Sequence, residues 1–502
     1  MGSLHERNRS LWVATTEPGD YPSVVGDDQS DVVVVGAGIT GLTTARLLVE
    51  EGLSVIVIDA GALCAGATGN TTAKITSLHG LTYAQLADRF DEDRARLYGE
   101  ANQAAIAEIE RLVTLDRIDC AFERRGHVVY TTDASSAESI AEEAELAARL
   151  GLPATRHAPT ELPFDVAAAV RFDNQAQFHP RAYCLGLARA ITAAGGRIFT
   201  HTRARDIDGD GRAVVTEHGE LRADAIVVAT HLPIKQLGAY FARTEPWRSY
   251  ALAVAVEGER PRDMYISVDS PTRSLRTAGD HLIVGGEGHK VGEVHDTTEH
   301  YRNLEAWARQ HFEVSAVDHR WSAQDWTAAD GVPYIGRLAG HDEGVYVATA
   351  FKKWGMTHGT VAAAIIRDLI TGRDNPWLEV YDATRIAPKQ SLKGVIAENL
   401  SVIKHFVGDR IHTSGRDAID RLGAGEGTVT RLDGDAVAAY RDDDGTVHAR
   451  SAVCTHLGCL VSFNSAERSW DCPCHGSRFA TDGSVLEGPA VDDLAPRQPS
   501  ST

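Results

Sequence analysis

Apolar and polar positions near the start of the chain predict a strand, a helix and a second strand in succession. Residues 31–36 read Asp-Val-Val-Val-Val-Gly, a run of β-branched side chains typical of a buried parallel strand. Residues 42–52 have the spacing of a helix with one apolar face, and residues 54–59 form a further apolar run that ends in Asp59. This order predicts a βαβ unit.

A glycine-rich turn, Gly-Ala-Gly-Ile-Thr-Gly at residues 36–41, joins the first strand to the helix. A GxGxxG pattern alone is weak evidence, but in a βαβ unit it indicates dinucleotide binding. Gly36 permits the tight turn, Gly38 lets a diphosphate approach the backbone, and Gly41 lets helix and strand pack closely. The diphosphate then lies at the helix N-terminus, and Asp59 accepts hydrogen bonds from ribose hydroxyls. The alternative, a glycine turn without a nucleotide, fits this context less well.

Other segments favour FAD over NAD as the dinucleotide. A flavoprotein reductase that uses NAD(P)H normally has a second GxGxxG unit, and the glycines at 285–288 lack its spacing. Residues 66–74 form a small, polar loop that suits passage under a flavin ring, and residues 223–230 form an apolar strand. Residues 354–359 open an Ala/Ile-rich helix, whose first N–H groups would stabilise charge on the reduced ring. The predicted FAD contacts are Gly36, Gly38, Ile39, Thr40, Gly41, Asp59, Thr71, Thr72, Ala73, Thr230, Asp330, Gly336, Gly355, Met356 and Thr357.

Two short loops near the C-terminus each combine a cysteine with a histidine. Cys454 and His456 lie in Cys-Thr-His-Leu-Gly-Cys, and Cys472 and His475 lie in Cys-Pro-Cys-His-Gly-Ser. This is the ligand set of a Rieske [2Fe–2S] cluster, in which two histidines replace two cysteines on one iron. A Cys₂His₂ zinc site is the alternative, but zinc motifs normally separate the cysteine pair from the histidine pair. A Rieske cluster passes one electron at a time.

With these motifs in place, residues 30–385 resemble the glycine oxidase/D-amino-acid oxidase superfamily, and the C-terminal loops resemble Rieske proteins of cytochrome bc-type complexes. The resemblance implies an α/β Rossmann-like FAD-binding domain, an α+β substrate domain and a small all-β Rieske domain. It also implies a Cys459–Cys474 disulfide and a hydrogen bond from Ser477 to the cluster. Phe479 stands where those relatives have a tyrosine, so we expect a lower cluster potential.

The family architecture implies how the chain divides into domains. The expected parts are an N-terminal extension (1–30), a discontinuous FAD-binding domain (31–90, 170–245 and 320–385), a substrate domain (91–169 and 246–319), a linker with an amphipathic helix (386–425) and the Rieske domain (426–502). Within the substrate domain, the residue pattern predicts helices at 94–112 and 135–150 and strands at 126–132 and 281–285.

The resemblance implies a dehydrogenase that acts on an amine or amino acid and passes electrons singly through the cluster to an external acceptor. Arg276 and Tyr265 lie in strand-like segments where the superfamily often binds a carboxylate, which an arginine can pair bidentately. Lys74 follows the flavin loop, and Trp354 is a candidate wall of the pocket. A surface role for Arg276 and a half-buried structural role for Tyr265 are the simpler interpretations, and packing alone is the alternative for Trp354.

Three other functions remain open at this stage. Electrons could enter through the cluster and reduce FAD for another protein, or the flavin could react with oxygen as an oxidase. A Rieske non-haem iron oxygenase needs two histidines and a carboxylate, for which His295, His300 and Glu293 are candidates. That class lacks an FAD unit and places its Rieske domain first, so we disfavour it.

The 502 residues carry a formal net charge of −20, which argues against nucleic acid as a partner and suits a basic redox partner. No apolar run is long enough for a transmembrane segment and residues 1–30 lack a signal-peptide core, so we expect a cytoplasmic protein. Cys64, Cys120 and Cys184 are expected to be buried thiols. A disulfide in a reducing compartment persists only if it is shielded.

Overall fold

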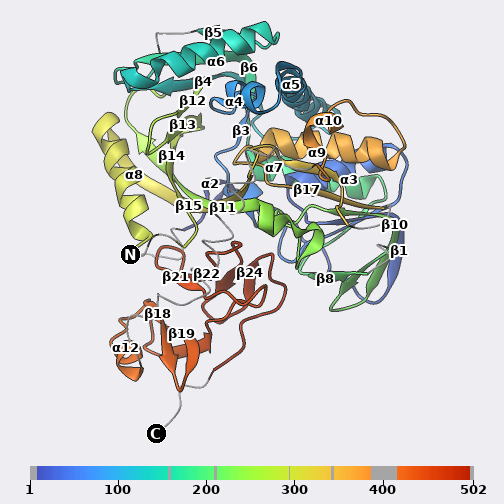
Figure 1. Ribbon diagram of the computed structural model, residues 1–502, viewed down its shortest axis with the longest axis vertical. Coiled ribbons are helices and arrows are strands. Elements are labelled where there is room, and N and C mark those ends of the chain that lie inside the picture. Colours follow the sequence, from blue (N-terminus) through green and yellow to red (C-terminus); the bar gives the residue numbers. More distant parts are fainter. Residues whose placement is uncertain are drawn as a thin grey trace.

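Two large sheets and two small sheets make up the computed structural model (Figure 1). It describes residues 8–156, 160–208, 212–292, 294, 296–340, 344–385 and 415–497. The two small sheets belong to the C-terminal part of the chain, which is coloured orange to red and occupies the lower left of the view. No helix in these residues combines the length and the apolar character needed to cross a membrane.

The first large sheet contains the predicted βαβ unit and has the order β16-β17-β10-β1-β2-β7. β1 runs parallel to both β2 and β10, and its last four residues are fully buried. Val32 and Val34 belong to the core on one face of the sheet, whereas Val33 and Val35 belong to the core on the other. The continuous valine run therefore has the cause that the sequence predicts, burial of a parallel strand on both faces. The strands are β1 (Asp28–Val35), β2 (Val55–Ile58), β7 (Arg197–Phe199), β8 (Ala204–Ile207), β9 (Ala213–Thr216), β10 (Glu220–Val228), β16 (Tyr334–Arg337) and β17 (Val345–Thr349).

Two helices that pack on this sheet bring their N-terminal turns together. α3 (Ile39–Glu50) follows the glycine turn, and α9 (Gly355–Ile370) follows β17. A Cβ atom at Gly359 would lie 2.7 Å from the Thr40 hydroxyl, so the crossing of the two helices requires glycine there. Because helix N-termini favour negative charge, this crossing places two such ends in one region. The helices α7 (Pro180–Ala193), α5 (Glu92–Leu115) and α10 (Leu378–Tyr381) complete this layer.

The second large sheet is mostly antiparallel and has the order β15-β11-β14-β13-β12-β4-β6-β3. Along β11, Ala251 and Ala253 pack into the core shared with the first sheet, whereas Tyr250 and Leu252 pack into a separate core with α8. Its strands are β3 (Lys74–Ile75), β4 (Glu123–Thr131), β5 (Ala154–Arg156), β6 (Ala168–Gln177), β11 (Thr244–Val256), β12 (Met264–Ser267), β13 (Arg273–Ala278), β14 (His281–Lys290) and β15 (Val314–Ala328). Its helices are α4 (Thr82–Arg89), α6 (Ala137–Arg149) and α8 (Thr298–His311).

The local elements predicted for the substrate domain are confirmed. α5 and α6 cover the two predicted helices, and β4 and β14 cover the two predicted strands. The division into domains stays a prediction, and two of its expected boundaries, 170 and 320, fall inside the second-sheet strands β6 and β15. Most of the expected linker, residues 386–414, lies outside the described residues.

The C-terminal part forms two small antiparallel sheets around one core. The first sheet has the order β18-β19-β20 and the second β21-β22-β23-β24. Trp470 and Phe479 are completely buried in this core, and the cysteines of the two motif loops pack with them. The elements are α12 (Arg416–Asp420), β18 (Gly427–Leu432), β19 (Asp435–Arg441), β20 (Val447–Ser451), β21 (Ser462–Asn464), β22 (Ser469–Asp471), β23 (Arg478–Ala480) and β24 (Val485–Glu487).

Candidate flavin site and iron–sulfur centre

The glycine turn after β1 has no room for side chains at two of its positions. A Cβ atom at Gly41 would lie 1.8 Å from the Gly36 carbonyl oxygen, and one at Gly36 would lie 2.4 Å from the Ala229 carbonyl oxygen. Gly38 is more open, because only the Thr68 hydroxyl lies near, at 3.1 Å. α3 begins at Ile39 after the N-cap residue Gly38, and the Ile39 N–H donates to the Thr68 hydroxyl at 3.1 Å. The N–H groups that follow Ile39 in the first turn can bind an anion that approaches over Gly38.

Asp59 lies at the end of β2, beside this turn. Its carboxylate accepts hydrogen bonds from the backbone N–H groups of Ala37 (2.7 Å) and Gly61 (2.8 Å). Burial raises the pKa of Asp59, and these two N–H donors act in the opposite direction. A carboxylate offers about four acceptor sites, so Asp59 retains capacity for ribose hydroxyls. The structure thus places the predicted diphosphate and ribose contacts together.

The polar loop predicted to pass under the flavin is held from both sides. Thr71 Oγ1 accepts a hydrogen bond from the Ala73 N–H, and the Ala73 backbone has a left-handed φ of 58°. Trp321 of β15 donates its indole N–H to the Asn70 carbonyl at 2.9 Å. A Cβ atom at Gly285 would lie 3.3 Å from Thr72, which places the loop against β14. The loop residues Thr71, Thr72 and Ala73 therefore lie beside β14 and β15 of the second large sheet.

The N-terminal extension also fixes this loop, which the sequence did not indicate. α2 (Leu11–Ala14) packs against it, and the Ser10 hydroxyl donates to the Gly69 carbonyl. The Trp12 indole N–H donates to the Thr71 carbonyl at 2.7 Å, and its ring lies 5.1 Å from the Arg276 guanidinium carbon. Residues 10–14 of the predicted extension therefore pack against this loop and hold it in place.

The Arg276 side chain supports the same loop by hydrogen bonds to backbone carbonyls of that loop. Its Nη1 atom donates to the carbonyls of Ala73 (2.7 Å), Phe178 (3.0 Å) and Thr72 (3.3 Å). Burial lowers the pKa of Arg276 to about 9. The predicted role of Arg276 in binding a substrate carboxylate stays a prediction, and the contacts observed are those of a loop support.

Lys74 and Tyr265 contact each other. Lys74 Nζ donates to the Tyr265 carbonyl at 2.6 Å and to the Ser274 hydroxyl, and burial brings the pKa of Lys74 well below its ordinary value. The Tyr265 hydroxyl accepts from the Glu161 N–H at 3.2 Å. Both residues are therefore engaged by the protein, and their catalytic roles stay predictions.

The segment before α9 presents an indole ring and bare N–H groups. Trp354 precedes the first residue of the helix and stacks on His79 with ring centroids 4.6 Å apart. Both nitrogens of His79 are engaged, with the Tyr98 hydroxyl at 2.6 Å and the Thr76 carbonyl at 2.7 Å. α9 has no capping side chain, so the N–H groups from Gly355 to Thr357 fit the predicted flavin contact.

Three other predicted FAD contacts have neighbours within the protein. The Asp330 carboxylate is paired with Arg385 at 2.8 and 2.9 Å and accepts from the Val332 N–H. Gly336 lies against Leu378 of α10, and the Thr230 hydroxyl donates to the Leu232 carbonyl. Their contact with FAD stays a prediction, and Asp330 in particular anchors the turn before β16.

The residue that sequence reasoning missed is Lys353. Its Nζ atom lies 5.6 Å from the centroid of the Trp247 ring and has no hydrogen-bond acceptor among the residues that the structure describes. A Cβ atom at Gly288 would lie 2.8 Å from this nitrogen, which places it against β14. The Lys353 N–H donates to Asp325 at 2.5 Å, and its φ of 70° is left-handed. The only sequence signal was a lysine directly before the Trp-Gly turn.

The two C-terminal loops bring the four predicted cluster ligands together. Cys454 and Cys472 are buried free cysteines that pack in the same core. The rings of His456 and His475 lie 5.0 Å apart, and the Nδ1 atom of each is buried without a hydrogen-bond partner. Burial lowers the pKa of both histidines, that of His475 to about 3, and neutral imidazole is the form that binds metal. Two orphaned ring nitrogens and two thiols fit a Cys₂His₂-ligated cluster.

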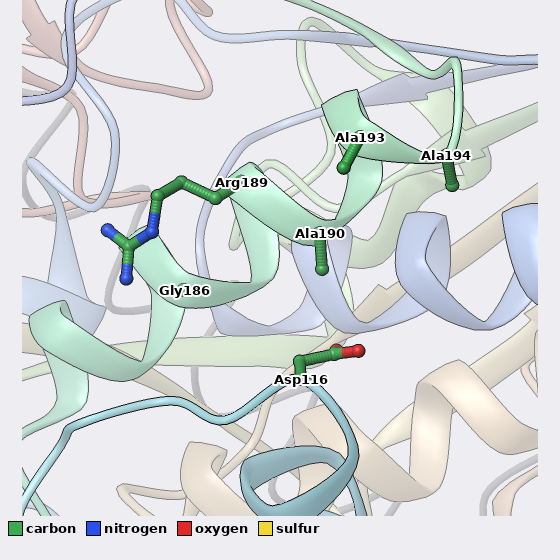
Figure 2. Close-up of a pocket in the computed structure, with 6 residues that line it drawn as sticks. All are labelled: Asp116, Gly186, Arg189, Ala190, Ala193 and Ala194. Atoms are coloured by element: carbon green, nitrogen blue, oxygen red, sulfur yellow. The ribbon is translucent and has the colours of Figure 1, made fainter.

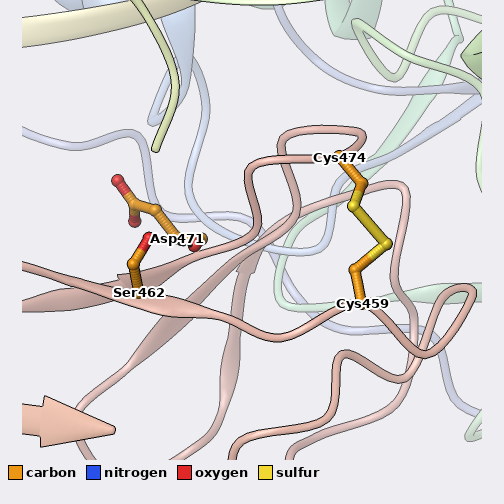
Figure 3. The surroundings of a disulfide bond; sticks show 4 residues. All are labelled: Cys459, Ser462, Asp471 and Cys474. Atoms are coloured by element: carbon orange, nitrogen blue, oxygen red, sulfur yellow. Dashed lines mark hydrogen bonds between the residues drawn. A yellow bond between two sulfur atoms is a disulfide. The ribbon is translucent and has the colours of Figure 1, made fainter. Parts of the chain in front are cut away.

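Figure 3 shows the Cys459–Cys474 disulfide, with Ser462 and Asp471 nearby. The sulfur atoms of Cys459, Cys472 and Cys474 lie within 4.8 Å of one another. The pairing implied by the resemblance is therefore present, directly beside one predicted ligand. All three of these cysteines are buried, which shields the disulfide from reductants.

The histidine end of the cluster site faces the rest of the protein. His456 Nε2 lies 2.8 Å from the Lys235 carbonyl, and Phe241 packs edge-on against both histidine rings. The Trp326 indole N–H donates to the His475 carbonyl at 3.3 Å. The cluster site thus lies at the junction with the chain that forms the flavin unit.

A surface hollow of about 480 Å³ lies away from both sites (Figure 2). Arg189 and several alanines of α7 line it, together with Asp116 at the end of α5. None of the predicted site residues lines it.

Gly41→Ala is expected to abolish FAD binding, because the added methyl group collides with the Gly36 carbonyl and opens the turn that receives the diphosphate. Gly66→Ala is the matched control, since no atom lies within 4 Å of a Cβ atom there. The measurement is flavin retained per chain after gel filtration. Equal retention by both variants would contradict this account of the turn.

Comparisons with known proteins agree with both sites. The family model for FAD dependent oxidoreductases (DAO) matches residues 31–369, and that of the Rieske [2Fe-2S] domain matches residues 417–497. The "Putative Rieske 2Fe-2S iron-sulfur protein YhfW" of Bacillus subtilis is 36% identical over 496 residues, which cover 97% of each chain. The cytochrome b6-f iron-sulfur subunit 1 of Nicotiana tabacum is 47% identical over 74 residues, 14% of this chain and 32% of its own.

Solved structures resemble the fold of the larger part. Glycine oxidase from Geobacillus kaustophilus has a TM-score of 0.60 and 19% identity, and the match covers 72% of this chain and 99% of the oxidase. L-proline dehydrogenase from P. horikoshii has a TM-score of 0.59 and 20% identity, with 73% and 99% covered. The DAO domain implies FAD, and the Rieske domain implies a [2Fe–2S] cluster. The chain belongs to the DAO family of FAD dependent oxidoreductases and carries a Rieske [2Fe-2S] domain at its C-terminal end.

Proposed function

We propose that this protein is an amine or amino-acid dehydrogenase in which electrons pass singly from FAD through the Rieske cluster to an external acceptor. The observation that carries the proposal is the position of the cluster site. His456 and His475 lie at the junction with the flavin unit, in contact with Lys235, Phe241 and Trp326. A cluster in that position suits transfer within one chain.

The two cofactors supply complementary chemistry, since FAD accepts two electrons from an organic substrate and the cluster accepts them one at a time. We propose that Cys454, His456, Cys472 and His475 hold the cluster. We propose further that residues 36–41, Asp59 and the start of α9 hold FAD. The protein's own contribution is to fix both groups, exclude water and orient the substrate.

An amino acid as substrate is supported by Lys353. Its Nζ lies beside Trp247 and near β14, without an acceptor among the described residues, so we propose that it binds the substrate carboxylate. Arg276, the first candidate from the sequence, already donates to three backbone carbonyls. Several of the similar solved structures are oxidases, deaminases or dehydrogenases of amino acids, which supports the same substrate class.

Lys353→Met is expected to raise KM for an amino acid roughly tenfold or more with little change in kcat, because a charge-assisted hydrogen bond contributes about 1.5–3 kcal/mol. The measurement is anaerobic flavin reduction by an amino acid and by the amine that lacks its carboxylate. The substitution should raise KM for the amino acid and leave KM for the amine unchanged. Lys352→Met is the matched control, since Lys352 contacts Gln85 instead. An equal effect on both substrates would contradict carboxylate binding.

The direction of electron flow is tested by anaerobic mixing with a panel of amines and amino acids. In the wild type, flavin absorbance should fall first, and the EPR signal of the reduced cluster should follow. In Cys472→Ser, which removes a proposed cluster ligand, the flavin should still be reduced and no cluster signal should appear. If a reduced ferredoxin reduces the flavin and no member of the panel does, electrons flow from the cluster to FAD, opposite to the proposed direction. Rapid peroxide release in air would instead indicate an oxidase.

Phe479→Tyr is expected to raise the midpoint potential of the cluster. Phe479 is completely buried in the same core as Cys454 and Cys472, and a phenolic hydroxyl there would donate a hydrogen bond that stabilises the reduced cluster. An EPR-monitored redox titration measures the change. Phe463→Tyr, on the outer part of this core, is the control. An unchanged potential in Phe479→Tyr with the cluster retained would contradict the expectation.

A further inference from the structure

A row of alternating charges crosses the second Rieske sheet. Asp471 of β22, Arg478 of β23 and Glu487 of β24 are successive cross-strand partners. Arg478 lies 3.2 Å from Asp471 and 3.6 Å from Glu487. Their side chains are at most 20% exposed, so solvent screens this row weakly. We call these three residues the charge row.

Each end of the charge row meets an opposite charge from outside the Rieske domain. Asp471 lies 3.5 Å from Arg248 of β11, whose side chain is 1% exposed. Glu487 lies 3.4 Å from Nδ1 of His231, in the loop after β10. The charge row is therefore held at one end by the second large sheet and at the other by the first.

His231 itself lies between two carboxylates. Its Nε2 is 2.8 Å from Asp325 of β15, and its Nδ1 faces Glu487. A neutral imidazole has only one N–H, so both ring nitrogens can donate only when the ring is an imidazolium. The backbone of His231 has a left-handed φ of 70°, and such strain persists only where the surroundings impose it.

The charged groups around His231 favour its protonated form. Burial lowers the pKa of His231, but its hydrogen bonds to Asp325 and Glu487 outweigh burial and raise the pKa to about 9. Arg478 faces the same Glu487 carboxylate from the Rieske side, and Arg248 lies at the far end of the charge row. Protonation thus favours the docked arrangement below pH 9, and the contribution is lost as the pH rises through that value.

Asp325 links this bridge to the substrate side of the flavin site. One of its carboxylate oxygens accepts from the Lys353 N–H, and the other accepts from His231 and from the Trp326 N–H. Trp326 in turn lies edge-on to His231 at 4.4 Å and donates to the His475 carbonyl. The loop before α9, His231 and the cluster loop therefore share one set of contacts.

We propose that His231 is a positioning residue whose imidazolium fastens the Rieske domain to the flavin unit and so sets the rate of electron transfer between the two cofactors. This inference rests on the proposed transfer within one chain. Because tunnelling slows steeply with distance, a domain that loosens its contact transfers electrons more slowly. Within the described residues the side-chain partners of His231 are Asp325, Glu487 and Trp326, none of which is a predicted cluster ligand, so its effect is one of placement.

The test uses the full-length protein with both cofactors and needs no substrate. The flavin is reduced by a light flash with EDTA and a deazaflavin, and the appearance of the reduced cluster is followed from pH 6 to pH 10. The wild-type transfer rate should be constant at low pH and fall through about pH 9. Flavin photoreduction itself should not vary among the variants.

Two substitutions separate charge from packing. His231→Asn is neutral and tolerates a left-handed backbone, and it should transfer roughly tenfold more slowly at pH 7 with no fall near pH 9. His231→Arg keeps a cation at every pH and should restore the rate and hold it above pH 9. Glu487→Gln, which removes the charge from the Rieske side, should slow transfer in the same way. This last variant reports the bridge independently if His231→Asn does not fold.

The possible failures are distinguishable. If His231→Asn or Glu487→Gln has the wild-type rate and pH profile, His231 does not position the Rieske domain, and the proposed function stands. If the wild type never transfers an electron from flavin to cluster at any pH, the proposed function fails.

Discussion

The fixed placement of the Rieske domain against the flavin unit is the constraint on which the rest of this structure depends. Three kinds of contact hold it. The charge row meets Arg248 and His231 at its two ends, Trp326 and Gln324 donate to the carbonyls of His475 and Gly476, and Asn464 accepts from Thr297 near α8. Buried ion pairs contribute little net stability because desolvation offsets their attraction, but removal of one partner is costly. Such contacts therefore specify one orientation more than they add free energy.

The candidate flavin site has two boundaries of different origin. One is local, because the glycine turn, Asp59 and α3 are made by a continuous stretch of chain around β1 and β2. The other is assembled from distant segments, in which α2, β13 and β15 supply Trp12, Arg276 and Trp321 to the loop that precedes β3. The loop backbone is satisfied by these side chains instead of by water, as buried carbonyls require. The same bonds engage Arg276, whose predicted contact with a substrate carboxylate stays a prediction. The Lys353 Nζ has no hydrogen-bond acceptor among the described residues.

Sequence reasoning succeeded where the interactions join residues close together in the chain and failed where they join distant ones. The valine run of β1, the helices α5 and α6 and the two Cys–His loops depend on neighbours within a few residues, so spacing was enough to find them. The partner of Asp330 could not be found in this way, because its carboxylate is paired with Arg385, 55 residues away in sequence. His231 gave no signal, because the carboxylates that act on it, Asp325 and Glu487, come from two other elements of the chain.

The sequence by itself determined the chemistry of this protein: a dinucleotide turn in a βαβ unit and four residues of the type that hold a Rieske cluster. Short motifs are enough to identify both sites, because tight turns and metal-binding loops position their N–H groups and ligand side chains through local backbone geometry. Only the tertiary structure decided which cations are engaged by other groups of the protein and how the cluster loops lie against the flavin unit. Those outcomes depend on pairs far apart in the chain, such as His456 with Lys235 and Asp471 with Arg248, whose meeting is fixed by packing.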